Sequence, residues 1–186
     1  MNRKIFEMRR KEFETWLEKS LVSNEFTQAW DLIRLTGTSV GFLTFDGMAK
    51  LAPPLREGQR NMGLYNPETH EIILPLGVSL MLQQRDVHER WDAEDEAAYG
   101  LVHNMGLEDT EENIRIYCSL IALHELGHSE DRGYLMNPHS DLQAERLAWD
   151  HVLTFIEYLY PDHEKKDMMI YMVECWYDQL PLLYEE

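Results

Sequence analysis

The chain has 186 residues, and its formal net charge at pH 7 is −17. That length fits one compact domain, and a hydrophobic content of 44% can supply its core. The acidic balance argues against nucleic-acid binding through phosphate contacts, but it permits electrostatic attraction to a basic partner. No apolar run has the length of a membrane span, and the first residues lack the apolar segment of a secretory signal.

The chain has two cysteines, Cys118 and Cys175, and both lie in apolar helical segments. They are expected to be reduced core residues without a disulfide framework, which favours an intracellular, cytoplasmic location. Zinc ligation by either cysteine is not expected, because neither has a Cys or His neighbour at ligand spacing apart from the motif described below.

The N-terminal part predicts two helices and then a small sheet. Apolar residues at helical spacing predict a helix over residues 3–21 and another over Asn24–Leu35, which ends at Gly37. A strand is expected at Thr38–Phe45, with Asp46-Gly47 as the turn that follows it.

A β-hairpin is predicted further along. Residues 61–65 and 70–75 have strand character, and Asn66-Pro67-Glu68-Thr69 between them is a typical turn sequence. With the strand at Thr38–Phe45, these segments predict a three-stranded, mostly antiparallel sheet. The rest of the chain is expected to be helical, with segments at about residues 78–90, 92–105 and 163–179 in addition to the two discussed next.

The most informative segment is His124-Glu125-Leu126-Gly127-His128, which has the form H-E-x-x-H. On a helix, histidines four residues apart lie on one face and can bind a single zinc ion. Glu125 can then act as general base towards a water at the metal. Residues 114–123 before the motif are strongly apolar, which indicates a buried helix. Histidines and a carboxylate are costly there unless they are paired or bind metal.

The start of this helix and the glycine within it are also informative. Asp109 or Thr110 can be its N-cap, and the acidic residues that follow suit a helix N-terminus. Gly127 costs about 1 kcal/mol of helix stability relative to alanine. One reason to tolerate that cost is another backbone that crosses closely at Gly127.

A catalytic zinc ion needs a third protein ligand, and the next predicted helix offers carboxylates. The S-x-x-Q sequence from Ser140 predicts a capping box, and a proline predicts the helix end near Tyr160. Glu145 falls on the apolar stripe of this helix, where a carboxylate needs a partner such as zinc. Asp141, in the first turn, is the alternative ligand, and the loop residue His139 is a third candidate.

The chemistry expected of a zinc ion and a general base in this motif is most often peptide hydrolysis. That reaction also needs a hydrogen-bond donor for the tetrahedral oxyanion. Tyr134 and His139 are the candidates, because they lie in the loop between the two predicted ligand helices. His151 is ranked below them, because it follows Glu145 by six residues, about 600 degrees around a helix, and so projects away from the zinc face.

The H-E-L-G-H segment, followed by Ala144-Glu145-Arg146-Leu147-Ala148-Trp149, resembles the gluzincin pattern of H-E-x-x-H and then a helix with E-x-x-A. Among small gluzincins the chain is most similar to the ImmA/IrrE-type metallopeptidases, over roughly residues 114–156. The resemblance implies that His124, His128 and Glu145 bind zinc and that Glu125 is the base. It also implies a protein substrate, which in that family is often a transcriptional repressor cut at one site.

That family usually has an acidic or amide residue four positions after the ligand glutamate. Here the position is Trp149, and a register with Asp141 as ligand would restore the pattern, because Glu145 would then be the residue four positions later.

We therefore expect one α+β, helix-rich, minimal zincin-like domain over residues 1–186, with N-terminal helices (1–36), a sheet (38–75) and a helical part with the zinc site (78–179). The predicted function is that of a zinc-dependent metallopeptidase that cleaves a protein, with a basic DNA-binding regulator as a candidate substrate. Such proteases hold an extended substrate against a sheet edge. The alternatives are a non-catalytic binding or regulatory module on the same scaffold, and a metal-dependent hydrolase of a non-peptide substrate.

Overall fold

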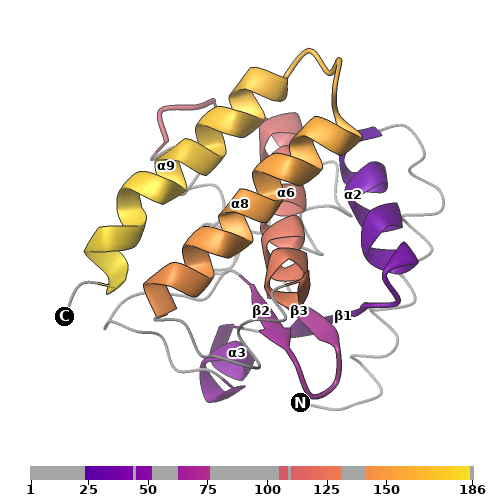
Figure 1. Ribbon diagram of the computed structural model, residues 1–186, viewed down its shortest axis with the longest axis vertical. Coiled ribbons are helices and arrows are strands. Elements are labelled where there is room, and N and C mark those ends of the chain that lie inside the picture. Colours follow the sequence, from indigo (N-terminus) through magenta and orange to yellow (C-terminus); the bar gives the residue numbers. More distant parts are fainter. Residues whose placement is uncertain are drawn as a thin grey trace, which may run out of the picture.

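The computed structural model describes residues 24–43, 45–51, 63–75, 105–108, 110–130 and 141–184. These residues form an α+β, helix-rich arrangement in which the long helices gather on one side of a small sheet (Figure 1). The elements are α2 (Asn24–Leu35), β1 (Ser39–Leu43), α3 (Phe45–Leu51), β2 (Leu64–Asn66), β3 (Glu71–Pro75), α6 (Glu111–Glu130), α8 (Asp141–Leu159) and α9 (Lys166–Tyr184). The expected helix-rich α+β class is confirmed.

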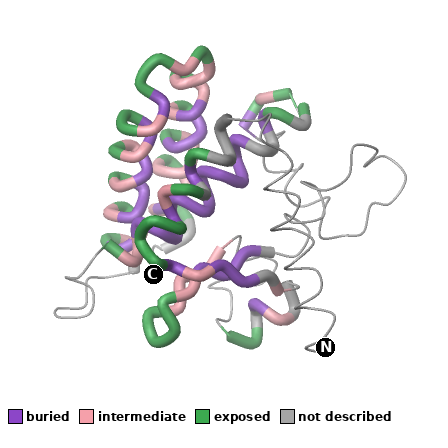
Figure 2. The backbone as a smooth tube through the Cα atoms, turned by 90° about the vertical axis from the view of Figure 1, so that its right-hand side faces the viewer, coloured by how far each residue is buried: buried purple, intermediate pink, exposed green. Residues whose placement is uncertain are grey.

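The three-stranded sheet has the order β1-β3-β2, and its strands are mixed in direction. β2 and β3 form the predicted antiparallel hairpin, in which Tyr65 pairs with Ile72. The side chain of Asn66 accepts hydrogen bonds from the backbone N–H groups of Glu68 and Thr69 and so stabilises the turn. Figure 2 shows this turn as an exposed loop, in agreement with the exposure of residues 67–70.

The expectation of a mostly antiparallel sheet is wrong for β1, which runs parallel to β3 with Val40 opposite Ile72. The expected turn at Asp46-Gly47 is also wrong, because both residues belong to α3. Met48 in α3 is only 1% exposed, so a helix that buries this side chain takes the place of the turn. The chain therefore leaves β1 through a crossover, and only such a connection allows two strands to pair in parallel.

The observed ends of α2 and α9 can be compared with the predicted ranges. α2 spans Asn24–Leu35 as predicted, and Gly37 follows it with a φ of 77°, the left-handed conformation typical after a helix end. α9 begins at Lys166 instead of residue 163, because hydrogen-bonded turns occupy the residues just before it. It also continues past residue 179, where Leu180 is buried. The helices predicted at 3–21 and 78–90, and nearly all of that at 92–105, lie outside the described residues.

α6 lies between α8 and α2 in Figure 1. Every one of its residues from Ile116 to Gly127 is buried. A helix that is apolar on most of its circumference must be enclosed in this way, as predicted. Its N-cap is Thr110, one of the two predicted candidates, whose hydroxyl oxygen accepts a hydrogen bond from the backbone N–H of Asn113 at 3.2 Å. The H-E-x-x-H segment thus belongs to a helix whose preceding residues lie in the core of the protein.

α6 and α8 cross in close contact at Gly127. A Cβ at this position would lie 2.7 Å from the carbonyl oxygen of Ala148, closer than real Cβ atoms approach, and 3.0 Å from its Cα, which is also a tight contact. The expected close crossing of another backbone at this glycine is confirmed. It brings the histidine-bearing face of α6 against the glutamate-bearing face of α8.

Both cysteines are free, with Cys118 buried and Cys175 half-buried, as expected for reduced residues. Burial raises the pKa of the Cys118 thiol to about 12, so this thiol is not a reactive nucleophile at neutral pH. Among the described helices, none is long and apolar enough to cross a membrane.

Candidate metal centre

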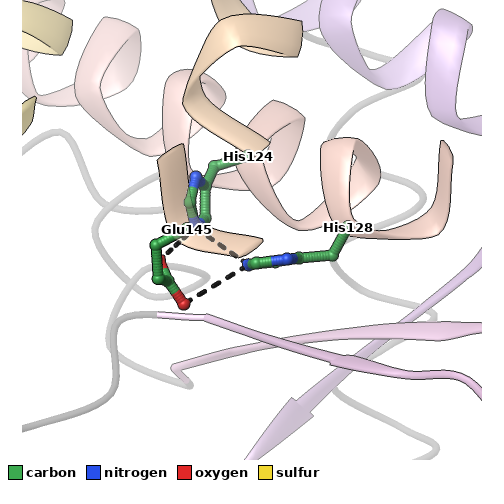
Figure 3. A group of neighbouring side chains, drawn as sticks. All are labelled: His124, His128 and Glu145. Atoms are coloured by element: carbon green, nitrogen blue, oxygen red, sulfur yellow. Dashed lines mark hydrogen bonds and ion pairs between the residues drawn. The ribbon is translucent and has the colours of Figure 1, made fainter. Parts of the chain in front are cut away.

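Three side chains from two helices converge at the crossing of α6 and α8 (Figure 3). His124 and His128 are one turn apart on α6, and Glu145 lies on α8. The Nε2 atom of His124 lies 3.0 Å from Oε2 of Glu145, and the Nε2 atom of His128 lies 3.5 Å from Oε1 of the same carboxylate. The two Nε2 atoms are 3.1 Å apart.

These distances are those of ligands around a small metal ion. Donors at about 2.0–2.1 Å from a zinc ion in a tetrahedron lie about 3.3 Å from one another. The three separations, in which each histidine faces a different oxygen of the Glu145 carboxylate, lie between 3.0 and 3.5 Å and bracket that value. Two imidazole nitrogens and one carboxylate oxygen are also a donor set that zinc accepts. The residues therefore fit a zinc ion in both spacing and chemistry.

The exposure of the three side chains is graded. The His124 side chain is only 6% exposed, whereas His128 and Glu145 keep 21% and 24% of their side-chain surface exposed. Burial lowers the pKa of His124, against the opposing effect of its hydrogen bond with Glu145. His124 is therefore disposed to be neutral, which is the form that binds metal.

Glu145 is disposed to be ionised. Burial alone would raise the pKa of its carboxyl group, but hydrogen bonds with His124 and His128 outweigh burial and bring the pKa well below its usual value. A carboxylate beside two histidine nitrogens is the charge distribution that a divalent cation needs.

Glu125 lies next to this group without being part of it. It is 5% exposed, and burial raises the pKa of its carboxyl group to about 8, with the charge of Glu145 adding to the effect and His128 opposing it. A divalent cation held by the neighbouring ligands would favour the ionised form. A buried carboxyl group whose pKa lies near neutrality is suited to proton transfer.

The sheet reaches this carboxyl group through Gly63, the residue just before β2. A Cβ at position 63 would lie 2.7 Å from both Cγ and Cδ of Glu125. Only a glycine allows the backbone to pass here without moving the glutamate. Sequence analysis missed Gly63, because nothing local in the sequence indicates which helix residue lies beneath the start of that strand.

A second missed contact is that of Trp149 with the ring of His124. The two ring centroids are 4.3 Å apart with an interplanar angle of 35°. The spacing along α8 places Trp149 on the same stripe as Glu145, but the partner of its ring depends on how the two helices cross.

The structure gives less information on the other residues considered as ligands or oxyanion donors, apart from His151. Asp141 is the first residue of α8, but its side chain is not described. Tyr134 and His139 lie outside the described residues. His151 is described and stacks on Phe155 instead of joining the group of three, as expected from its place on the helix.

Comparison with known proteins identifies no relative: the chain matches no family model, no curated protein and no solved structure. The function is therefore argued from the site itself.

Proposed function

We propose that the protein is a zinc-dependent metallopeptidase that acts on a protein substrate. The observation that carries this proposal is the group of three donors with a buried glutamate beside it. The donor atoms of His124, His128 and Glu145 are all within 4.8 Å of one another, and Glu125 adjoins the first of them in the chain. Within the described residues only three side chains form such a group. Three protein ligands leave one tetrahedral position for water or substrate, as in catalytic rather than purely structural zinc sites.

Zinc bound there would supply Lewis acidity, which activates water and polarises the carbonyl of the scissile peptide bond. The carboxylate of Glu125 removes a proton from the attacking water and passes it to the nitrogen of the leaving amine. His124 and His128 would hold the ion through Nε2, and the carboxylate of Glu145 would supply the negative charge of the ligand set. The burial of Glu125 keeps bulk water away from its carboxyl group during the transfer.

A peptide substrate is favoured by the position of β2. This strand is at the edge of the described sheet, where β3 is its sole partner. An extended peptide can add to such an edge through backbone hydrogen bonds. Since Gly63 immediately before β2 lies against Glu125, a peptide paired with this strand would pass close to the base.

The net charge of −17 favours a basic substrate, and a DNA-binding regulator is the protein class that we propose. Electrostatic attraction of this kind raises the rate of encounter and weakens as salt is added.

The test compares the native protein with Glu125→Gln and with Glu130→Gln, an exposed glutamate near the end of the same helix. Zinc is measured by metal analysis, and cleavage is followed by proteomic comparison of cells that express each protein. We expect about one zinc ion per chain in all three, and substrate cleavage lost only in Glu125→Gln.

Three outcomes would contradict the proposal. No bound zinc at micromolar metal would remove the ligand assignment. Zinc with no difference in cleavage between the native protein and Glu125→Gln would instead support a binding or regulatory module. Hydrolysis of small esters or amides without any change in cellular proteins would point to a non-peptide hydrolase.

A further inference from the structure

The imidazole of His124 is part of a row of three aromatic rings. Its neighbour Trp149 is 2% exposed and stacks in turn on Trp176, with centroids 5.8 Å apart and an interplanar angle of 14°. The three rings come from three helices, α6, α8 and α9. The indole of Trp149 is therefore in contact with two rings, and one of them belongs to a candidate metal ligand.

The second ring nitrogen of His124, Nδ1, indicates that the contact with Trp149 has a role beyond packing. Nε2 faces the other two donors, so a metal ion takes Nε2 and the ring proton must sit on Nδ1. Nδ1 is buried, and no hydrogen-bond partner for it exists among the described residues. Metal-binding histidines usually donate this N–H group to a carboxylate, carbonyl or water, which sets the direction of the ring. Among the described residues no such acceptor is present, whereas the indole of Trp149 lies against the ring of His124 and can orient it.

We propose that Trp149 is the positioning residue for His124, and that its indole, in close tilted contact with the imidazole, performs the orienting role that a hydrogen-bond acceptor has at other sites. Binding of a cation through Nε2 draws electron density from the imidazole and makes the ring more positive. The face of an indole carries negative charge density, so the stack becomes more favourable when metal is bound. Metal binding and the His124–Trp149 contact therefore stabilise each other.

This inference rests on the metal site of the proposed function, but not on hydrolysis. Its prediction concerns zinc affinity, which is measured without any substrate. A native protein that binds zinc but cleaves nothing would contradict the peptidase proposal and would leave the affinity comparison below intact.

The experiment uses Trp149→Leu, which removes the aromatic face, and Trp149→Phe, which keeps one. Zinc dissociation constants are measured by competition with a chromophoric chelator. The loss of a group that orients a ligand typically weakens metal affinity by about 10–100-fold, so we expect at least a tenfold loss in Trp149→Leu. In Trp149→Phe the loss should stay within about threefold, because a phenyl ring also stacks on imidazole.

The matched control is Ile156→Ala. Ile156 is fully buried on the same helix as Trp149, seven residues further along and about 10 Å away. This variant should lose thermal stability and keep the zinc affinity of the native protein. The proposal is overturned if folded Trp149→Leu binds zinc as tightly as the native protein, or if Ile156→Ala weakens binding equally.

A second measurement covers the case in which Trp149→Leu does not fold. Zinc is titrated into the native protein while tryptophan emission is recorded, and we expect a saturable change that disappears in Trp149→Phe. An unchanged emission in the native protein at saturating zinc would contradict the contact between the ligand ring and the indole.

Discussion

Two glycines lie beside the candidate site, and each allows a different close approach. Gly127 faces the backbone of Ala148, which cannot move without separating α6 from α8. Gly63 faces the side chain of Glu125, which can move by changing its rotamer. The first glycine sets the distance between the helices that carry the ligands, and the second sets the position of the base under the sheet. In the proposed function, metal binding and proton transfer would thus depend on different contacts and could be perturbed separately.

The largest effect is expected on the ligand side of this comparison, from Glu145→Gln. The amide removes the charge that balances a divalent cation, and zinc affinity should fall by more than about 100-fold, beyond the loss seen for residues that merely orient ligands. Competition with a chelator measures this directly. If the variant binds zinc as tightly as the native protein, Glu145 is not the third ligand, and Asp141 or His139 takes that role.

On the base side, Gly63→Ala should abolish most cleavage and leave zinc in place. The new methyl group would displace the Glu125 carboxyl group, and a shift of about 1 Å can cost roughly 100-fold in rate. Cleavage rates and bound zinc are measured on the same samples.

The matched test of this contact is the pair Glu125→Asp and Gly63→Ala/Glu125→Asp. Aspartate lacks the Cδ atom of glutamate but keeps the Cγ atom, so the loss of rate caused by the added methyl group should be smaller in its presence but not absent. Equal losses in both backgrounds would show that Gly63 acts on something other than the base.

A smaller effect is expected for Gly127→Ala. The methyl group would overlap the Ala148 backbone and lower the free energy of unfolding by about 1–3 kcal/mol, reduced by up to about 1 kcal/mol of gained helix propensity. Chemical denaturation of the metal-free protein measures the change. Zinc affinity should weaken as well, because the two ligand helices move apart, and unchanged affinity would contradict the role given to this crossing.

A further effect concerns the pH dependence of stability in the metal-free protein. Burial raises the pKa of Glu125 from 4.5 to about 8, so the folded state binds the proton more tightly than the unfolded state. Its contribution to stability is therefore complete at low pH and is lost as the pH rises from about 4.5 to 8. Glu125→Gln, which cannot titrate, should show a flatter profile across this window when unfolding is measured at each pH. Parallel profiles would contradict the shifted pKa.

The part of the structure that follows local rules was predictable from the sequence. Apolar spacing predicted α6 as a buried helix, the side chain of Thr110 caps it, and the cost of a helical glycine predicted the crossing at Gly127. The position of Glu145 on an apolar stripe predicted that its carboxylate would have partners, and the structure places it against both histidines.

What the sequence could not provide depends on distant parts of the chain. The parallel pairing of β1 with β3 joins residues about thirty positions apart in the sequence, and local turn preferences at Asp46-Gly47 do not report it. The contacts of Gly63 with Glu125 and of Trp149 with His124 likewise arise only once the sheet and the helices are assembled.

The graded exposure of the three donors has a kinetic consequence. The His124 side chain is almost fully buried, whereas His128 and Glu145 each have about a fifth to a quarter of their side-chain surface in contact with solvent. A metal ion bound here would therefore leave the outer pair first and His124 last. Because the two outer side chains are partly exposed in the folded state, its exchange rate would be set by how a small chelator reaches them and would be independent of the global opening of the protein.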